Sequence, residues 1–284
     1  MNLTLRPAPP NTGILLRRLD IPQSEPTRAI LANVTDGKLA TTIGENGTGV
    51  NTVEHLLGAL AGLGIDNALI ELDSAEIPIM DGSAQPFVEL FRRARFKFQN
   101  ELKKFVMIKE PIKVSCKDKF IEAFPSERLT IDFTIDYSHP MIRKQSYTFP
   151  FSYNNFVKEI SSARTFCLLE DVEVLRANGY AQGGSLENAV VIHKSGILNS
   201  DGLRFPDEFV RHKILDLIGD LSLLGHPIIG HIKAYKSGHV LNHQFLRKIL
   251  SAHDKWELTK LVPMRNKFVF QKSHHSPFIP LQMP

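Results

Sequence analysis

The chain has 284 residues, of which 43% are hydrophobic, enough for one large domain or two small ones with ordinary cores. It holds no run of about 18 apolar residues and no signal peptide at its N-terminus, so we expect a cytoplasmic protein without a transmembrane helix. Cys116 and Cys167 form no Cys-x-x-Cys pair, which argues against disulfides and thiolate zinc sites and fits a reducing compartment.

The charge of the chain is mildly positive, with a net charge of +4 and a pI of about 9.0. The basic residues form no concentrated patch with aromatic or groove-reading motifs, so we expect neither a nucleic-acid partner nor stable membrane insertion. A few well-placed lysines would suit a small anionic substrate. The 11 histidines make metal or proton chemistry worth testing.

The first hundred residues are predicted to form short strands and two helices. Asn51 or Thr52 is a suitable N-cap for a helix over residues 52–64. Glu54 and His55 lie in the first turn of this helix, away from its apolar stripe. The predicted strands are residues 2–6, 14–18, 29–34, 39–43 and 67–72, and the second helix spans residues 86–94.

The charged stretch from Arg92 to Lys104 predicts a domain boundary. Strands and helices follow one another on both sides of it, so we expect an α+β chain of two domains of similar plan, each a β-sheet layered with helices. The predicted parts are residues 1–99, residues 105–262 and a tail over residues 263–284. The later strands are predicted at 105–108, 112–116, 120–124, 129–137, 146–151, 189–193 and 228–235, and the later helices at 155–161, 169–178, 205–225 and from the loop 236–239 to about residue 253.

The helix predicted over residues 205–225 has two distinct faces. His212, Asp216 and Asp220 are spaced by four residues and therefore lie one above the other. Gly219 lies on this polar face and would leave room for a ligand. Such a column is weak evidence on its own, because most polar faces are only solvated. The opposite, apolar face holds Val210, Ile214, Leu217, Ile218 and Leu221.

Polar residues elsewhere could complete a catalytic metal site. Catalytic zinc typically takes three nitrogen or oxygen ligands, which His55, His212 and Asp216 would supply. Glu54, next to a ligand, could act as a general base, and His239 could act as a general acid whose imidazole is held by the last aspartate of the column. Each assignment has a plain alternative, because a histidine at a helix start or in a loop is usually a capping or surface residue.

Six blocks of this sequence together resemble the family of UDP-3-O-acyl-N-acetylglucosamine deacetylases, the zinc amidases that commit Gram-negative bacteria to lipid A synthesis. The resemblance covers nearly the whole chain, in order and with compatible spacing. The matching blocks are Thr52–Asn67, Glu76–Ser83, Ser162–Phe166, Asp201–Phe205, Glu208–Asp220 and Ala234–His239.

The resemblance implies a hydrolase that removes the N-acetyl group of an acylated UDP-sugar, with zinc as cofactor and Fe²⁺ as a possible replacement. The implied metal ligands are His55, His212 and Asp216. The implied catalytic residues are Glu54 as base, His239 as acid, Asp220 as the partner of His239, and Thr165 as the oxyanion donor. The implied substrate contacts are Phe166, Lys213, Lys236, Asp136, Tyr137, Gly184 and Ser185.

The family resemblance also implies an arrangement in space. The metal site would lie between the two domains, and an insert near residues 169–191 would form an apolar passage for the 3-O-acyl chain. We expect a monomer.

The sequence departs from the family pattern at its start. Family members usually begin with a further strand and a Gly-Leu-His-x-Gly turn, and residues 3–9 here match the family's segment immediately after that turn. We therefore expect this chain to lack the family's first strand. Two alternatives to the deacetylase stay open: an inactive or weakly active homologue that only binds nucleotide sugar or acyl chain, and a zinc amidase for another N-acyl substrate.

Overall fold

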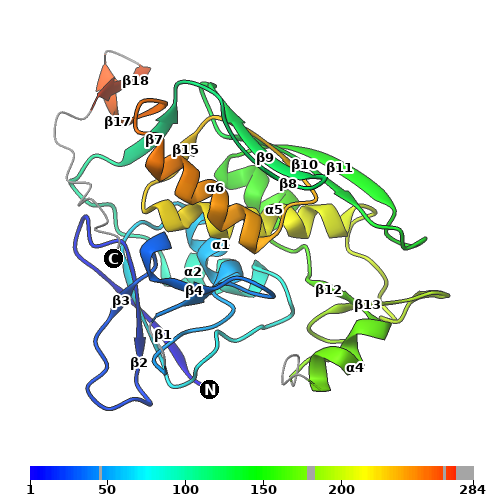
Figure 1. Ribbon diagram of the computed structural model, residues 1–284. Helices are drawn as coiled ribbons and strands as arrows, with labels where there is room; N and C mark the ends of the chain where they lie inside the picture. The colour runs from blue at the N-terminus through cyan, green and yellow to red at the C-terminus, as the bar shows by residue number, and fades with distance from the viewer. Residues whose placement is uncertain (45–46, 178–182, 265–266, 273–284) are drawn as a thin grey trace.

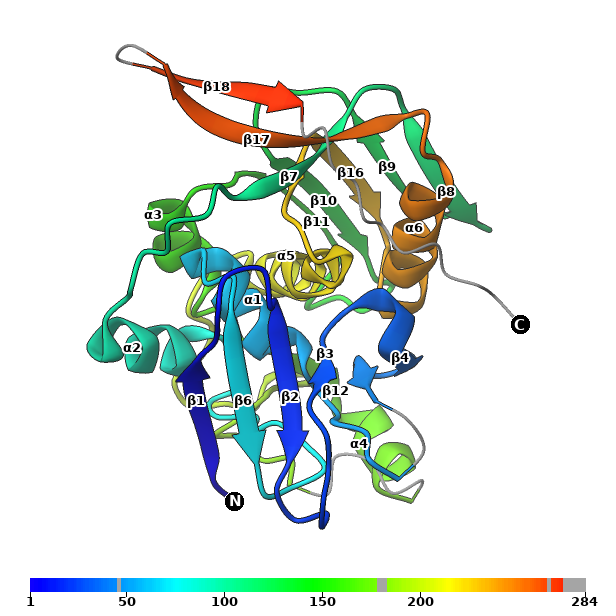
Figure 2. The same cartoon turned by 90° about the vertical axis from the view of Figure 1, so that its left-hand side faces the viewer.

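The computed structural model describes residues 1–44, 47–177, 183–264 and 267–272 and has a four-layered α+β architecture. Two helices, α1 (Glu54–Leu63) and α5 (Glu208–Leu221), pack against each other in the middle. They are accompanied by α2 (Gln85–Ala94) and α6 (His239–Ser251), and a β-sheet lies outside each helical layer (Figures 1 and 2). The predicted α+β class is confirmed, while the division into domains at residues 99–105 stays a prediction.

The first sheet is formed entirely by the N-terminal part of the chain, in the order β1-β6-β2-β3. Its strands are β1 (Leu3–Pro7), β6 (Ala68–Leu72), β2 (Ile14–Arg18) and β3 (Thr27–Arg28). β6 pairs antiparallel with β1 and parallel with β2. Leu16, Ile70 and Leu72 turn their side chains into the core that this sheet shares with α1.

Between this sheet and α1 the chain is less regular than expected. Residues 29–34, predicted as a strand, contain the 3-10 turn η1 (Leu31–Asn33), because the backbone there bonds to carbonyls three residues back. β4 (Val34–Asp36) and β5 (Thr42–Ile43) form a short separate ribbon, so the predicted strand 39–43 is confirmed only at its end.

The second sheet has the order β11-β10-β16-β9-β8. Period-two alternation in β10 buries Ile131, Phe133 and Ile135 against α5. The helix α6 packs on β8 and β9. The strands are β8 (Ile112–Cys116), β9 (Lys119–Phe124), β10 (Thr130–Asp136), β11 (Lys144–Pro150) and β16 (His231–Tyr235).

The strand predicted over residues 228–235 is divided at Gly230. Its first part, β15 (Ile228–Ile229), pairs with β7 (Lys104–Ile108), whereas β16 belongs to the second sheet. A Cβ on Gly230 would lie 2.9 Å from the Ile108 side chain and 3.1 Å from the Phe124 carbonyl oxygen. Glycine therefore allows the chain to cross from one sheet to the other at this point.

The C-terminal residues extend the sheet that β15 and β7 begin. We expected an irregular tail from residue 263, but β17 (Trp256–Met264) and β18 (Lys267–Lys272) form an antiparallel hairpin. β17 also pairs with β7. The expectation is therefore wrong for residues 267–272, because a pattern along one segment does not reveal backbone pairing with a neighbouring strand.

A smaller unit lies between β11 and β16 of the second sheet in the chain. α3 (Tyr153–Asn155) and the π-helical turn η2 (Phe156–Ile160) lead into a sheet of β12 (Phe166–Leu168), β13 (Val190–His193) and β14 (Gly196–Ile197). α4 (Leu169–Ala177) packs beside it, at the side of the molecule (Figure 1). Gly179, expected to end α4, lies outside the described residues. No helix in the described part of the chain is long and apolar enough to cross a membrane.

The packing of α1 on α5 corrects two expectations. The helix α1 begins after Val53 without a side-chain cap, since the Thr52 hydroxyl donates instead to Glu76. Gly219 does not make room for a ligand: a Cβ there would lie 2.2 Å from the Glu54 carbonyl oxygen. Gly219 therefore allows the two helices to approach closely, and the polar column of α5 is buried rather than solvated.

Replacing Gly219 with alanine should force α1 and α5 apart and destabilise the protein by about 3 kcal/mol, because backbone cannot move aside as a side chain can. Chemical denaturation measures this. Gly58→Ala on α1 is the matched control, since its Cβ would first meet the movable Leu215 methyl at 2.8 Å. Equal stability losses in the two variants would contradict the prediction.

Candidate metal and catalytic site

The fold brings His55 from α1 together with His212 and Asp216 from α5. Their potential ligand atoms all lie within 4.8 Å of one another, and all three residues are buried. Asp216 Oδ1 is 3.3 Å from His212 Nε2 and 3.5 Å from His55 Nε2. In the described part of the chain, this oxygen is buried and has no hydrogen-bond partner. An orphaned carboxylate oxygen facing two imidazole nitrogens fits a metal cation.

Neighbouring groups fix the orientation of the two ligands on α5. His212 Nδ1 is 3.1 Å from the Ala163 carbonyl oxygen, to which it donates when Nε2 serves as the ligand atom. Burial lowers the pKa of His212 to about 3, so its imidazole is neutral at physiological pH. Lys213 Nζ donates to Asp216 Oδ2 at 2.6 Å. Burial alone would raise the pKa of Asp216, but the adjacent imidazoles and the positive charge of Lys213 hold it well below its usual value.

Glu54 lies beside this metal group at the first turn of α1. Its Oε2 accepts a hydrogen bond from the Thr41 backbone N–H at 3.0 Å, and its Oε1 lies 3.8 Å from His239 Nε2. Burial raises the pKa of Glu54 above its ordinary value. A raised pKa makes this carboxylate a stronger base than an exposed glutamate, which suits a group that accepts a proton.

His239 is the first residue of α6, not part of the loop in which we expected it, and Gly238 before it is extended. Its Nδ1 donates to Asp220 Oδ2 at 2.8 Å. Burial alone would lower the pKa of His239, but the charge and hydrogen bond of Asp220, with the charge of Glu54, raise it to about 10. His239 is therefore cationic at neutral pH and presents Nε2 towards Glu54.

Three further residues, which the sequence analysis missed, also hold Asp220. Asn242 Nδ2 donates at 2.8 Å, the Thr41 hydroxyl donates at 2.7 Å, and His243 Nε2 lies 3.3 Å from Asp220 Oδ1. Asn242 and His243 lie three and four residues after His239, so helical spacing could have indicated them. Thr41 carried no such signal, because it lies in an irregular segment far from Asp220 in the chain.

A small cavity of about 140 Å³ lies beside Lys213, and several of the residues predicted to contact substrate line it. Lys236 pairs there with Asp118 at 2.6 Å, and Asp136 accepts a hydrogen bond from Tyr235. Sequence reasoning missed Lys119 and Ser237, which β9 and the segment before α6 bring to this place. The cavity is lined by Lys119, Ile135, Asp136, Tyr137, Lys213, Lys236 and Ser237.

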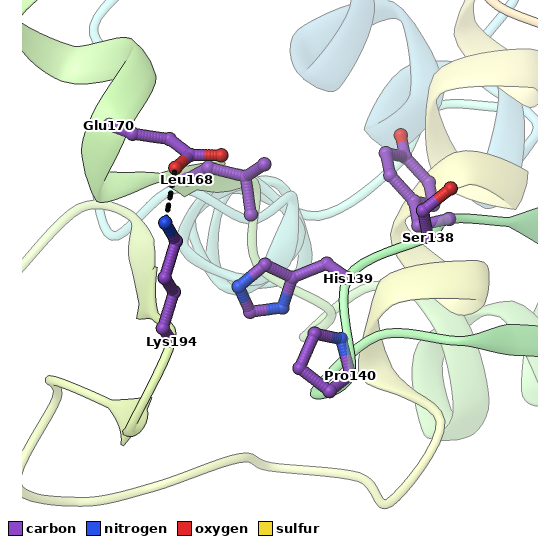
Figure 3. A pocket seen from close by; sticks show the side chains of 7 residues that line it. Ser138, His139, Pro140, Leu168, Glu170 and Lys194 are labelled. Carbon is purple, nitrogen blue, oxygen red and sulfur yellow. Dashed lines mark ion pairs between the residues drawn. The ribbon is translucent and has the colours of Figure 1, made fainter.

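A larger cavity of about 480 Å³ also has Tyr137 in its lining and lies between the turn after β10 and the β12–α4 unit (Figure 3). Phe166 connects this region with the metal group, because its ring lies 5.9 Å from that of Tyr137 and 6.2 Å from that of His212. The cavity is lined by Tyr137, Ser138, His139, Pro140, Leu168, Glu170 and Lys194.

The remaining predicted site residues lie along the segments that flank α4. Thr165 is half-buried and held by its backbone, which donates to the Gly82 carbonyl and accepts from Val190, both at 2.8 Å. Gly184 and Ser185 lie in the loop before β13. Ser185 is exposed, and its hydrogen bonds to Glu187 and Asn188 are local.

A buried group of three potential metal ligands beside a carboxylate and a cationic imidazole is typical of metal-dependent hydrolases. The family model of UDP-3-O-acyl N-acetylglycosamine deacetylase matches residues 1–251, so the chain belongs to this family, and the resemblance noted in the sequence is confirmed.

Proteins named UDP-3-O-acyl-N-acetylglucosamine deacetylase are similar to the chain over most of its length. The one from Idiomarina loihiensis is 53% identical over 260 residues, covering 90% of this chain and 85% of the relative. The ones from Saccharophagus degradans and Myxococcus xanthus are 52% and 50% identical, covering 90% and 94% of this chain and 85% and 84% of the relatives.

A divalent metal ion, supplied as zinc, should bind once per chain to wild-type protein and be lost from Asp216→Ala, because this change removes the carboxylate that faces both imidazoles. At a free concentration of 100 times its Kd, zinc should raise the unfolding free energy of the wild type by about 2.7 kcal/mol. Elemental analysis and thermal unfolding with and without zinc measure both effects. The surface pair of His231 and Asp132, 2.7 Å apart, provides the control variant His231→Ala, which should keep its zinc. Retention of zinc by Asp216→Ala would contradict the assignment.

The stability of the metal-free protein should depend on the charge of His239. Its pKa is about 10 in the folded state and 6.5 without interactions, so its stabilisation is complete below pH 6.5 and is lost as the pH rises towards 10. Relative to His239→Gln, the free energy of unfolding of the wild type should fall in this window by at most about 1.4 kcal/mol per pH unit. Denaturation of both proteins at several pH values checks this. The same dependence of the unfolding free energy on pH in the wild type and in His239→Gln would contradict it.

Proposed function

We propose that this protein hydrolyses the N-acetyl group of UDP-3-O-(3-hydroxyacyl)-N-acetylglucosamine, giving acetate and the free amine, as the committed step of lipid A biosynthesis. The observation that carries this proposal is the pairing of Glu54 with His239, 3.8 Å apart, beside the three-ligand metal group. Amide hydrolysis needs a base for the water and an acid for the leaving nitrogen. The names of the relatives support the choice of substrate.

Zinc is the metal we propose for His55, His212 and Asp216, since neutral imidazole and carboxylate ligands suit it, and Fe²⁺ is the alternative. When bound, zinc would polarise the acetamide carbonyl and lower the pKa of a water molecule.

The protein's own residues would then move the protons. Glu54 accepts a proton from the attacking water, and the raised pKa of its carboxyl group favours this transfer. The Thr165 hydroxyl donates a hydrogen bond to the oxyanion. His239 Nε2 donates its proton to the leaving nitrogen, while Asp220 holds Nδ1 and keeps the imidazole in position.

The polar head of the substrate would bind at the small cavity. Lys119, Lys213 and Lys236 offer positive charge to the diphosphate, and Asp136 with Tyr137 would hold the uridine. Phe166 would lie against the sugar between this cavity and the metal group. The acyl chain would run along the unit near residues 169–191, where Gly184 and Ser185 would contact the substrate.

Further expectations belong to this proposal. The site would lie between domains of residues 1–99 and 105–262, and the protein would act as a monomer in the cytoplasm. Both cysteines are free thiols, in keeping with a reducing compartment.

Purified protein should release acetate from the UDP-sugar substrate, and His239→Ala should lower turnover by about 10²-fold or more while zinc stays bound. A deacetylase assay with metal analysis tests this, with His231→Ala as a control that keeps full activity. Unchanged turnover in His239→Ala would remove this residue from the mechanism. Zinc binding without acetate release would favour the non-catalytic binder, and a lack of competition by UDP would favour an amidase for another substrate.

A further inference from the structure

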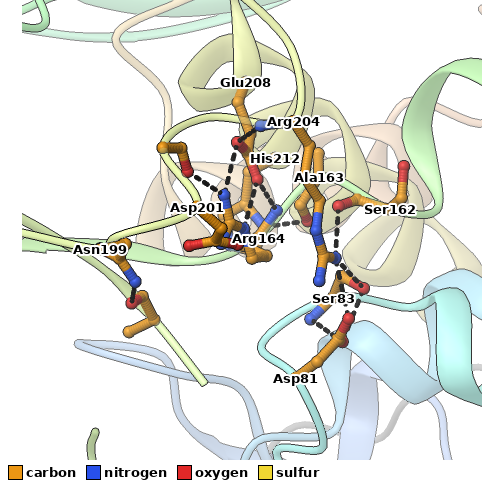
Figure 4. A network of polar contacts seen from close by, with 12 residues as sticks. Asp81, Ser83, Ser162, Ala163, Arg164, Asn199, Asp201, Arg204, Glu208 and His212 are labelled. Carbon is orange, nitrogen blue, oxygen red and sulfur yellow. Dashed lines mark hydrogen bonds and ion pairs between the residues drawn. The ribbon is translucent and has the colours of Figure 1, made fainter. Parts of the chain in front are cut away.

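A buried ion pair lies close to the metal group but includes none of the residues assigned to metal binding or catalysis. Glu208, in the first turn of α5, is 0% exposed, and Arg164, just before β12, is 3% exposed. Figure 4 shows the polar network around them. Neither residue reaches the cavities beside the site, so contact with substrate does not explain why two charges are buried here.

Glu208 binds two separate chain segments with its two oxygens. Its Oε1 accepts hydrogen bonds from the backbone N–H and the Nε of Arg164 at 3.0 and 2.9 Å. Its Oε2 accepts from the Arg204 backbone N–H at 2.6 Å and from Arg164 Nη2 at 3.2 Å. Arg164 also donates from Nη1 to Asp201 and from Nη2 to the Gly202 carbonyl, so its guanidinium makes four hydrogen bonds and both oxygens of Glu208 accept two each.

The two neighbours of Arg164 in the chain both serve the site. The Ala163 carbonyl lies 3.1 Å from Nδ1 of the metal ligand His212, and Thr165 is the proposed oxyanion donor. His212 lies four residues after Glu208 on the same face of α5. A closed ring of contacts therefore runs from Glu208 through Arg164 and Ala163 to His212 and back along one helical turn.

A second set of contacts ties this segment to the N-terminal part of the chain. Arg204 pairs with Asp81 at 2.8 Å and donates to the Ser162 carbonyl at 3.0 Å. The Thr165 backbone donates to the Gly82 carbonyl. The carbonyl that orients His212 is therefore restrained from both sides.

We propose that the ion pair of Arg164 and Glu208 positions the metal ligand His212 and the oxyanion donor Thr165, by fixing the backbone of residues 163–165 against α5. A buried ion pair usually gives little net stability compared with apolar residues, whereas its bidentate geometry is specific. Groups that orient a ligating histidine typically change metal affinity by about 10- to 100-fold when they are removed. The part of this inference that concerns Thr165 rests on the proposed function.

Two variants separate positioning from folding. Glu208→Gln removes the carboxylate charge and offers one acceptor oxygen where there were two. The double variant Arg164→Met with Glu208→Gln leaves no unpaired charge in the interior and should therefore fold even where the single variant does not. Asp207→Asn is the matched control, since it breaks the ion pair with Arg211 in the same turn of α5 without touching residues 163–165.

Zinc affinity and the visible absorption spectrum of the Co²⁺-substituted protein are the main measurements. Both variants should bind zinc about tenfold or more weakly and show an altered Co²⁺ spectrum, whereas Asp207→Asn should match the wild type. In the deacetylase assay kcat should fall while KM stays unchanged, because the substrate cavities are not altered.

Wild-type zinc affinity and an unchanged Co²⁺ spectrum in a folded variant would overturn the proposal. Failure of the double variant to fold would also overturn it, because the pair would then act in folding. The zinc titration needs no substrate. Absence of deacetylation by the wild type would therefore reject the proposed function and leave this inference to be judged on metal binding alone.

Discussion

The close contact of α1 with α5 at Gly219 is the constraint on which the site depends. Because Gly219 has no side chain, the backbone of Glu54 can pack directly against it. A Cβ on Gly219 would lie only 2.2 Å from the Glu54 carbonyl oxygen. This approach sets His55 beside the two ligands on α5, although they are distant in the chain. It also places the carboxylate of Glu54 opposite His239. One helix crossing thus supplies both the candidate metal group and the proposed acid–base pair.

Charge balance in the interior is the second constraint. Burial of an unpaired carboxylate is costly, and α5 carries three buried carboxylates. Glu208 is matched by Arg164, Asp220 by His239, and one oxygen of Asp216 by Lys213. The other oxygen of Asp216 is the exception, since it faces only imidazole nitrogens. A cation would complete the balance there, so structural and catalytic requirements coincide on this helix.

Much of the local structure could be predicted because it follows from periodicity. The alternation in β10 and the apolar stripe of α5 gave both elements within a few residues, and the spacing of His212 and Asp216 indicated two ligands on one face. Predictions failed where long-range contacts decide. The segment 29–34 turns instead of extending, and residues 267–272 gain order from a partner strand. The role of Gly219 depended on which helix would lie against it.

The sequence by itself determined the chemical groups, their spacing along each element and, through six matching blocks, the family. The spacing could be read because side chains on one helix or strand repeat with a fixed period, whereas the family followed only from the resemblance of the blocks. Only the tertiary structure decided which groups meet. Thr41 and His243 contact Asp220 together with His239, and Arg164 forms a buried ion pair with Glu208 near the metal group. These contacts join residues distant in the chain, and their geometry follows from how the helices pack, which no local period encodes.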